Sequence, residues 1–499
     1  MFSESAALAQ VRARLMALVQ EGFPPAPGVP RILVPVIPWY ETCVPHFSIL
    51  AALLLARRGQ VQPVFIVQDL PWPADAGYRL AELAALAPLL EALASHWPVH
   101  RLSDQQPGAV IDTAILEAAV KWDVRHWLGR GAITPEGVDG QSQRCRTAGE
   151  AIMRRLSPLL SLPGVDRILV PGGVVNGSLI YRRMAVAAGL RTFCYDAGPG
   201  LIVTGTEGPG GHHSDLVPLF ERVVEDWPQA HDGMVSEAQA LLADRERGQD
   251  RIIRIPFQAD RDTLAGDIVF FLSREHDSNW LDRDCLFDTQ SEWLCWTIPR
   301  LLAARPDLRI TVRGHPRGRL YPCRLSDRAL TDLTTLLPAD SRVRIIAKDE
   351  DISSYDLMRR ARLVTAGPST TCLEAAMMGR PVISTHVSSF TRAAGIAVRP
   401  VDRDTYLAML SRPEAPPPVD PHRAALMYWL LERTSRLLTR CNPIPDDLAA
   451  WTDRPIPEWL SDPAALYLIT MLETGRSIQE QRAIDALPLL MAGSGPGPA

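Results

Sequence analysis

One segment of the chain combines a β-branched run with a cluster of hydroxyl side chains and a carboxylate. It reads LVTAGPSTTCLEAAMMGRPVIST over residues 363–385. We expect a strand followed by a helix that Ser369, Thr370 and Thr371 open. Unpaired N–H groups at a helix N-terminus suit phosphate, and the hydroxyls there can bind an oxyanion or simply cap the helix. Glu374 is placed to accept a hydrogen bond from a ribose hydroxyl, or alternatively to complement the helix dipole.

A second candidate is the sequence Arg313-Gly314-His315-Pro316, at the end of another predicted strand. The proline restricts the backbone, so the imidazole of His315 can be held at a fixed angle. A histidine and an arginine at the end of a strand can neutralise a diphosphate or protonate a leaving phosphate. The alternative is a structural histidine in a turn.

The first half of the chain also places titratable side chains directly after predicted strands. The candidates are Glu41 and His46 in the sequence PWYETCVPH, Asp69, and Asp196. Any of them could act as a general base if it lay within hydrogen-bond reach of an acceptor hydroxyl. For each one taken singly, a structural role is the simpler interpretation. Asn176 and Arg182 are candidates for contacts with the acceptor or the donor, although Arg182 could lie on an exposed helix face.

These candidates depend on an alternation of short strands and helices. The predicted strands cover residues 31–37, 61–69, 166–173, 191–198, 266–272, 308–316, 342–349, 361–367 and 380–385. The predicted helices cover residues 47–58, 76–95, 178–188, 289–305, 354–360 and 369–378. This rhythm predicts an α/β protein with two doubly wound parallel sheets, in which ligands bind beyond the carboxyl ends of the strands.

The predicted domains follow from the same pattern. The boundary between the two halves falls near residues 250–262, which gives an N-terminal domain over 1–255 and a C-terminal domain over 256–440. Residues 441–499 form a tail, in which the Pro-rich segment 443–463 is predicted as loop and 464–486 as a helix that packs on either domain. The last residues, GSGPGPA, are predicted to be disordered.

Composition limits the class of protein. Of 499 residues, 46% are apolar and 22% charged, as in globular proteins. The net charge of −5 gives no bulk basic field for nucleic acid. Eight scattered cysteines without a CxxC pair indicate a reduced, cytoplasmic protein. The longest apolar run, residues 47–56, is too short to span a bilayer, although peripheral contact with an inner membrane stays open.

The segment GPGGHHSD (208–215) is predicted as a mobile loop, and its adjacent histidines do not have the spacing of a metal site.

The motifs together resemble bacterial capsule and surface polysaccharide glycosyltransferases of the GT-B fold, among them Kdo transferases and relatives of polysialyltransferases. The resemblance lies in the strand-HP motif, the DxxSYDLM segment (351–358), the S-T-x-x-x-E-A-x-x-x-G-x-P-V-I segment and FDTQSEWL (287–294). In the first half, VVNGSLIYRRMAVAAGLRTFCYDAG (174–198) is similar to the family's N-G-R to Y-E-x-G stretch. The likeness covers about residues 165–400. Asp196 stands where the family has glutamate, so its carboxylate reaches one methylene less far.

The resemblance implies two Rossmann-like domains with a cleft between them. It implies an inverting, metal-independent glycosyltransferase, without a cofactor, that moves a sugar from a CMP- or UDP-linked donor to a glycan or glycolipid acceptor of capsule or lipopolysaccharide type. The implied catalytic residues are Glu41, Asp196 and His315. The implied donor-binding residues are Arg313, His315, Ser369, Thr370, Thr371 and Glu374, and the acceptor-binding residues are His46, Asn176 and Arg182. A nucleotide-sugar epimerase and a non-catalytic glycan assembly protein are the alternatives.

Overall fold

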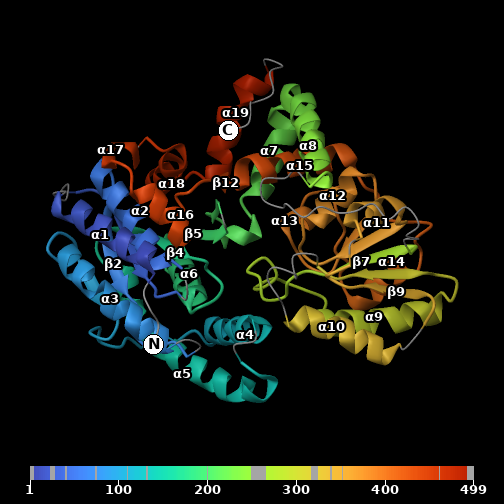
Figure 1. Cartoon of the computed structure of the whole chain (residues 1–499), viewed down its shortest axis with the longest axis horizontal. Helices are drawn as coiled ribbons and strands as arrows, with labels where there is room; N and C mark the ends of the chain where they lie inside the picture. The colour runs from blue at the N-terminus through green and yellow to red at the C-terminus, as the bar shows by residue number, and fades with distance from the viewer. Residues whose placement is uncertain are drawn as a thin grey trace. The chain divides into compact units, whose positions relative to one another are not determined.

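The computed structural model describes residues 5–22, 28–39, 42–73, 76–109, 111–130, 133–198, 200–248, 266–315, 324–337, 340–350, 352–459 and 461–491 (Figure 1). The chain divides into two compact units. The first contains Met1–Val124, Pro135–Asp215 and Thr434–Arg482, and the second contains Arg125–Thr134, Leu216–Arg433 and Ala483–Ala499. These units differ from the predicted domain ranges, because residues 216–248 cluster with the second sheet. Most of the predicted boundary at 250–262 lies outside the described residues.

The first unit is built on a sheet with the strand order β12-β6-β5-β4-β1-β2-β3. Strands β1 to β5 pair in parallel, whereas β6 pairs antiparallel to β5, and β12 antiparallel to β6. Its central strands are apolar on both faces, as expected of a parallel sheet covered by helices. The strands are β1 (Arg31–Val36), β2 (Gln62–Val67), β3 (Val99–Arg101), β4 (Val165–Pro171), β5 (Arg191–Gly198), β6 (Leu201–Gly205) and β12 (Leu437–Leu438).

Helices cover this sheet and bury its apolar side chains. They are α1 (Ala6–Gln20), α2 (Val44–Arg58), α3 (Ala76–Ala94), α5 (Val138–Leu156), α6 (Ser178–Ala187), α16 (Pro445–Thr452), α17 (Ile456–Trp459) and α18 (Pro463–Thr474). Helices α4 (Thr113–Arg130) and α19 (Ile478–Met491) contribute residues to both units. Helix α2 is buried along its first twelve residues, since α1, α18, β1 and β2 all pack on it, and it ends at Gly59 in the left-handed conformation.

The C-terminal segment differs from the prediction in a way that its prolines explain. The segment 443–463 was expected to be loop, but it contains α16 and α17, and Trp451 stacks on Trp459 with ring centroids 5.4 Å apart. Pro445 and Pro463 begin helices, where proline is favoured because its missing N–H would have no partner. The single helix predicted over 464–486 is two helices, because Gly475 ends α18 at φ +81°.

The second unit is built on a wholly parallel sheet with the order β11-β10-β7-β8-β9. Its strands are β7 (Ile268–Phe271), β8 (Ile310–Arg313), β9 (Val343–Ile346), β10 (Leu363–Ala366) and β11 (Val382–Ser384). Its helices are α7 (Leu216–Asp226), α8 (His231–Glu246), α9 (Gln290–Ala304), α10 (Arg324–Leu336), α11 (Ser354–Arg360), α12 (Thr371–Met377), α13 (Ser389–Arg392), α14 (Arg403–Leu410) and α15 (Pro421–Trp429). Helix α15 packs on α7, α8 and α12 (Figure 1). The predicted pair of doubly wound, Rossmann-like α/β sheets is confirmed.

The described helices include none that is long and apolar enough to cross a membrane. The cysteines that the structure describes are free thiols, and most of them are buried. Burial raises the pKa of Cys43 to about 12, with the carboxylate of Glu82 acting in the same direction. Such a thiol stays protonated near neutral pH and packs as a small apolar side chain.

Candidate active site

The carboxyl edge of the second sheet brings three of its loops together. The strand order reverses at β7, because β8 and β9 lie on one side of it and β10 and β11 on the other. In open α/β sheets the ligand site lies at such a reversal. The loop after β7 meets the loop after β10 where the amide Nδ2 of Asn279 donates to the carbonyl oxygen of Pro368 at 2.5 Å. The loop after β8 carries His315, which is partly exposed.

The carboxylate of Asp277, on the loop after β7, interacts electrostatically with His315. Burial raises the pKa of Asp277, but the charge of Arg274, contributions from His276 and His315 and the backbone N–H of Asn279 outweigh this effect and hold the pKa below its usual value. Arg274 Nη2 lies 2.5 Å from Asp277 Oδ2. A carboxylate beside an imidazole can orient the ring and stabilise its cationic form, the form that binds a phosphate oxygen. The phosphate-binding role of His315 stays a prediction.

A buried ion pair also holds the loop after β7. Arg125, near the end of α4, donates from Nη2 to Glu275 Oε1 at 2.7 Å, and the backbone N–H of Gln290 donates to the same oxygen at 2.6 Å. Glu275 is 1% exposed. Burial raises its pKa, and the charge of Arg125 opposes this rise. The next residue of α4, His126, lies with Nδ1 2.7 Å from the carbonyl oxygen of His276.

Two of the predicted donor-binding residues bond to other groups of the protein. Arg313 is buried and donates to the backbone carbonyl oxygens of Ala347, Glu350 and Ile352. Glu374 is also buried, and its Oε1 accepts from Arg245 Nη1 at 2.8 Å. Both side chains therefore have structural partners where contacts to a diphosphate and a ribose were expected. Their placement shows why charge at the end of a strand does not by itself predict exposure.

The hydroxyl cluster lies at the expected edge but caps its helix only in part. Ser369, Thr370 and Thr371 are partly exposed. The Ser369 hydroxyl accepts from the Thr371 N–H at 3.3 Å and lies 3.1 Å from the Thr371 Oγ1, whereas the side chain of Thr370, at the N-cap, makes no capping bond. Helix α12 has only seven residues. The hydroxyl groups, rather than a long helix dipole, are what this edge offers to a ligand.

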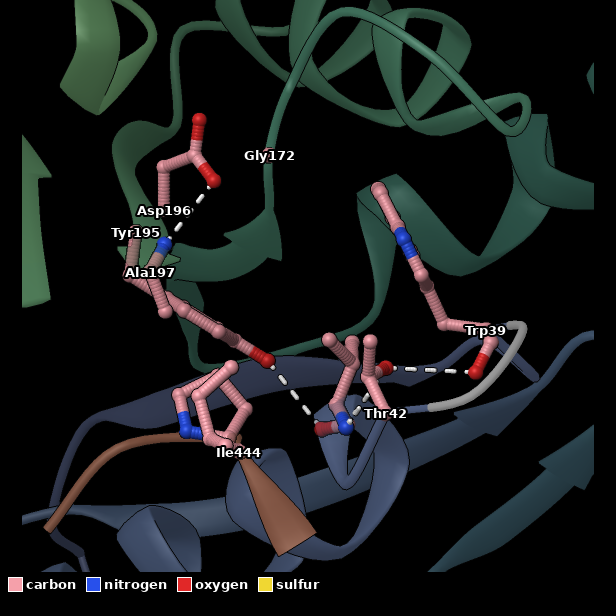
Figure 2. A pocket seen from close by; sticks show the side chains of 9 residues that line it. Trp39, Thr42, Gly172, Tyr195, Asp196, Ala197 and Ile444 are labelled. Atoms are coloured by element: carbon pink, nitrogen blue, oxygen red, sulfur yellow. Dashed lines mark hydrogen bonds between the residues drawn. The ribbon is translucent and has the colours of Figure 1, made fainter. Parts of the chain in front are cut away.

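The first sheet has a pocket of about 80 Å³ at its own carboxyl edge (Figure 2). It is lined by Trp39, Thr42, Val44, Gly172, Tyr195, Asp196, Ala197, Pro443 and Ile444. Trp39 and Asp196 lie on opposite sides of it in Figure 2. Asp196 was a predicted base, and its Oδ1 accepts from the Ala197 N–H at 2.8 Å. The structure thus places one predicted catalytic residue in a cavity.

Two of the other predicted residues near this edge have different outcomes. Glu41 lies outside the described residues. His46, in the first turn of α2, is fully buried, and neither ring nitrogen has a hydrogen-bond partner among the described residues. Burial lowers the pKa of His46 to about 3, and Arg12 acts in the same direction. A neutral, buried imidazole does not fit the acceptor-binding role predicted for it. The pattern PWYETCVPH could not reveal this, because α1 covers the helix from a distant part of the chain.

Asn176 and Arg182 hold the glycine-rich loop after β4. The N–H groups of Asn176 and Gly177 donate to the two carboxylate oxygens of Asp123, at 2.6 and 3.1 Å. Burial raises the pKa of Asp123 to about 7, although these two donors oppose the rise. Arg182 donates from Nε to the carbonyl oxygen of Gly173 at 2.7 Å. The backbone of Asn176 and the side chain of Arg182, both predicted to bind the acceptor or donor, therefore shape the loop that carries Gly172, a lining residue of the pocket.

The segment 208–215 is folded back by its own polar groups. Asp215 accepts from the N–H groups of Thr206 and Glu207, and His213 Nδ1 lies 2.8 Å from Ser435 Oγ. Within the part of the chain that the structure describes, no cluster of three or more His, Cys, Asp or Glu side chains could hold a metal ion.

Sequence reasoning missed Trp39, Arg125, Asp277 and Asn279. Three of them lie in loops that follow predicted strands, so the rule that selected His315 could have found them. Arg125 is different, because its partner Glu275 is 150 positions away in the sequence.

No protein-family model matches the chain, and no curated protein matches its sequence. Solved structures similar to it include KpsC of Thermosulfurimonas dismutans, a beta Kdo 2,4 transferase, at 12% identity over 58% of this chain and 88% of that one, with a TM-score of 0.38. The beta Kdo 2,7 transferase of the same organism's KpsC matches at 16% identity over 59% and 87%, with a TM-score of 0.35. The UDP-GlcNAc 2-epimerase of Neisseria meningitidis matches at 11% identity over 85% and 98%, with a TM-score of 0.27. Kdo transferases are thus among the similar structures, at likenesses too distant to assign an activity.

Proposed function

We propose that the chain is a glycosyltransferase that uses a nucleotide-activated sugar. The observation that carries the proposal is the meeting of three loops at the carboxyl edge of the second sheet, where His315 interacts electrostatically with Asp277 and the loop of Ser369 contacts Asn279 through Pro368. This edge offers a histidine, hydroxyl groups and amides, the groups that bind nucleotide phosphates. We assign it to the donor.

The pocket of the first unit is assigned to the glycan acceptor, and Asp196 is assigned as the base. In the proposed reaction the Asp196 carboxylate takes the proton of an acceptor hydroxyl, and the oxygen attacks the anomeric carbon. The bond between that carbon and the donor phosphate breaks, and the electron pair leaves with the phosphate. His315 neutralises the charge that develops there. A single displacement inverts the anomeric configuration, and this chain's own side chains supply the charge compensation. By the sequence resemblance, the acceptor is a capsule or lipopolysaccharide glycan.

The test is a thermal-shift panel with CMP, CDP, UDP, GDP and ADP, followed by product analysis with the responding nucleotide's sugars. A ligand at 100 times its dissociation constant stabilises the folded state by about 2.7 kcal/mol, a shift large enough to measure. We expect one base to respond in the wild type and the response to weaken in His315→Ala. A donor converted in the absence of any acceptor would identify an epimerase instead. Failure of every nucleotide would refute donor binding by this chain.

A further inference from the structure

The pocket of the first unit has walls of unequal chemistry. Trp39 presents a partly exposed indole, and Val44, Tyr195, Pro443 and Ile444 supply further apolar surface. Asp196 is the one acidic side chain among the lining residues, and none of these residues is basic. A cavity with an aromatic wall, apolar surroundings and one carboxylate suits a molecule that has both C–H and O–H groups.

The size of the pocket limits what enters it. A bound water needs about 10–15 Å³ of cavity volume, so a cavity of about 80 Å³ admits a group several times larger than one water. One edge of a sugar ring, with a hydroxyl or hydroxymethyl group and its carbon, is such a group.

The backbone that carries the aromatic wall is held in place before any ligand arrives. The backbone N–H of Trp39 donates to Glu82 Oε2 at 3.0 Å, and the Thr42 hydroxyl donates to the Trp39 carbonyl oxygen at 3.1 Å. The ring itself lies against Gly172, because a Cβ atom there would come within 2.9 Å of it. A backbone anchored in this way reduces the entropy lost on binding.

Tyr195 contributes ring surface rather than a hydroxyl. Its OH lies 2.6 Å from Ser48 Oγ. The same OH donates to the Val44 carbonyl oxygen at 3.2 Å (Figure 2). The hydroxyl is therefore engaged within the protein. This leaves the carboxylate of Asp196 as the charged group of the pocket and the natural acceptor for a ligand hydroxyl.

We propose that this pocket binds the edge of an uncharged pyranose, with its C–H face on the Trp39 indole and a hydroxyl donating to Asp196. The inference rests on the proposed function in naming this sugar as the end of the acceptor. Polarised C–H groups are attracted to the negative face of an aromatic ring, and a hydroxyl is a good donor to a carboxylate. A sugar acid would bring its own carboxylate near Asp196, and like charges repel. The pocket therefore selects neutral sugars over Kdo-like or sialic-acid-like ones.

The experiment is saturation-transfer NMR on the full chain, without nucleotide, using methyl glycosides of glucose, galactose and N-acetylglucosamine and the methyl glycoside of sialic acid. We expect saturation of at least one neutral glycoside and none of the sialoside. Trp39→Ala and Asp196→Asn should each weaken binding about tenfold, and Trp39→Phe should restore part of the loss. Glu117→Gln is the control, because this carboxylate of the same unit pairs with Arg146 and does not line the pocket.

The outcomes separate this inference from the proposed function. Binding of no neutral glycoside, preference for the sialoside, or binding that Trp39→Ala leaves unchanged would each overturn the inference. If nucleotides still respond in that case, donor binding survives. If glycosides bind as expected but no nucleotide does, the pocket is a sugar site of a protein that is not a glycosyltransferase. Circular dichroism and thermal midpoints of the variants exclude loss of folding as the cause.

Discussion

The two sheets repeat one arrangement with different consequences. In each, the loop after the first strand of the sheet sends an indole ring onto a glycine that follows a neighbouring strand. Trp39, after β1, lies on Gly172, which follows β4, and Trp280, after β7, lies on Gly367, which follows β10. Both places are where the strand order reverses. The same topology thus creates the same contact twice.

The difference lies in what surrounds the two rings. Trp280 is 3% exposed and packs edge to face on His386, with ring centroids 4.1 Å apart. Its ring therefore fills the switch point of the second sheet, the place at the carboxyl edge where the strand order reverses, and we call this switch point plugged. Trp39 is partly exposed and lines an open pocket. Where the switch point is plugged, a ligand must contact side chains farther from the sheet, such as His315. Where the switch point is open, as beside Trp39, the ligand can reach the edge of the sheet itself. The four predictions below test this contrast.

The largest expected effect concerns the buried histidines of the two edges. His386 has Thr385 Oγ1 2.8 Å from its Nδ1, but neither nitrogen of His46 has a partner among the described residues. The folded-state pKa of His46, about 3, lies below its usual 6.5, so between these values the unfolded state binds the extra proton. Stability is therefore lost as pH falls from 6.5 towards 3, by up to several kcal/mol at about 1.4 kcal/mol per unit of pKa.

His46→Leu removes this proton and should make the first unit less sensitive to acid. We expect the variant to be at least as stable as the wild type at pH 7, because no hydrogen bond among the described residues is lost, and its advantage to grow progressively below pH 6. Hydrogen exchange in α2, followed from pH 7 to pH 4, measures the difference. A constant difference across that range would contradict the assignment of a neutral imidazole.

The second prediction concerns the ion pair that holds the loop after β7, which carries Trp280. Arg125→Met leaves Glu275 buried without its cationic partner, which typically costs about 3–5 kcal/mol. Amide exchange over residues 273–281 should rise, and the double variant Arg125→Met/Glu275→Gln should recover most of the protection. Arg300→Met, at an exposed arginine of α9, serves as the control. Unchanged exchange in Arg125→Met would mean that the ion pair does not hold the loop.

The third prediction tests whether the ligand of the second unit contacts His315, which lies outside the plugged switch point. His315→Ala should lower turnover about 100-fold, equivalent to about 2.7 kcal/mol, on the scale of losing one donor to a developing oxyanion. The thermal midpoint should stay close to that of the wild type, since the side chain is only partly buried. His422→Ala, at an exposed histidine of the same unit, should leave turnover unchanged. Near-native turnover in His315→Ala would remove this residue from the site.

Much of the fold was predictable, because the central strands of the two parallel cores are short apolar runs between turn residues. The run RILVPVI and the run GDIVFFL both mark central strands correctly. The tail was not predictable in this way, since the prolines of 443–463 suggested loop while two of them begin helices. Proline composition carries both meanings, and only the packing of Trp451 and Trp459 decides between them.

The sequence predicted that the site lies at the carboxyl edges of the sheets. It did not predict which side chains there are exposed to a ligand. The rule that ligands bind after strands selected His315 and Asp196, which are partly exposed at the two edges. It also selected Arg313 and Glu374, which the chain uses for its own carbonyl groups and for Arg245. The partners of these buried charges come from distant segments, and no spacing within a motif encodes them.

The smallest expected effect tests the two glycines directly. In Gly367→Ala the new Cβ would lie 2.3 Å from the buried ring of Trp280, so we expect a loss of about 1–3 kcal/mol from overpacking. Gly172 has φ +63°, so Gly172→Ala should cost about 1 kcal/mol through the backbone, and the partly exposed Trp39 should move aside. Amide exchange in each unit measures both losses. Trp280→Phe should relieve Gly367→Ala, whereas Trp39→Phe should not relieve Gly172→Ala, because a smaller ring does not change φ. Equal rescue in both units would mean that the two rings are packed alike and that the contrast between a plugged and an open switch point is wrong.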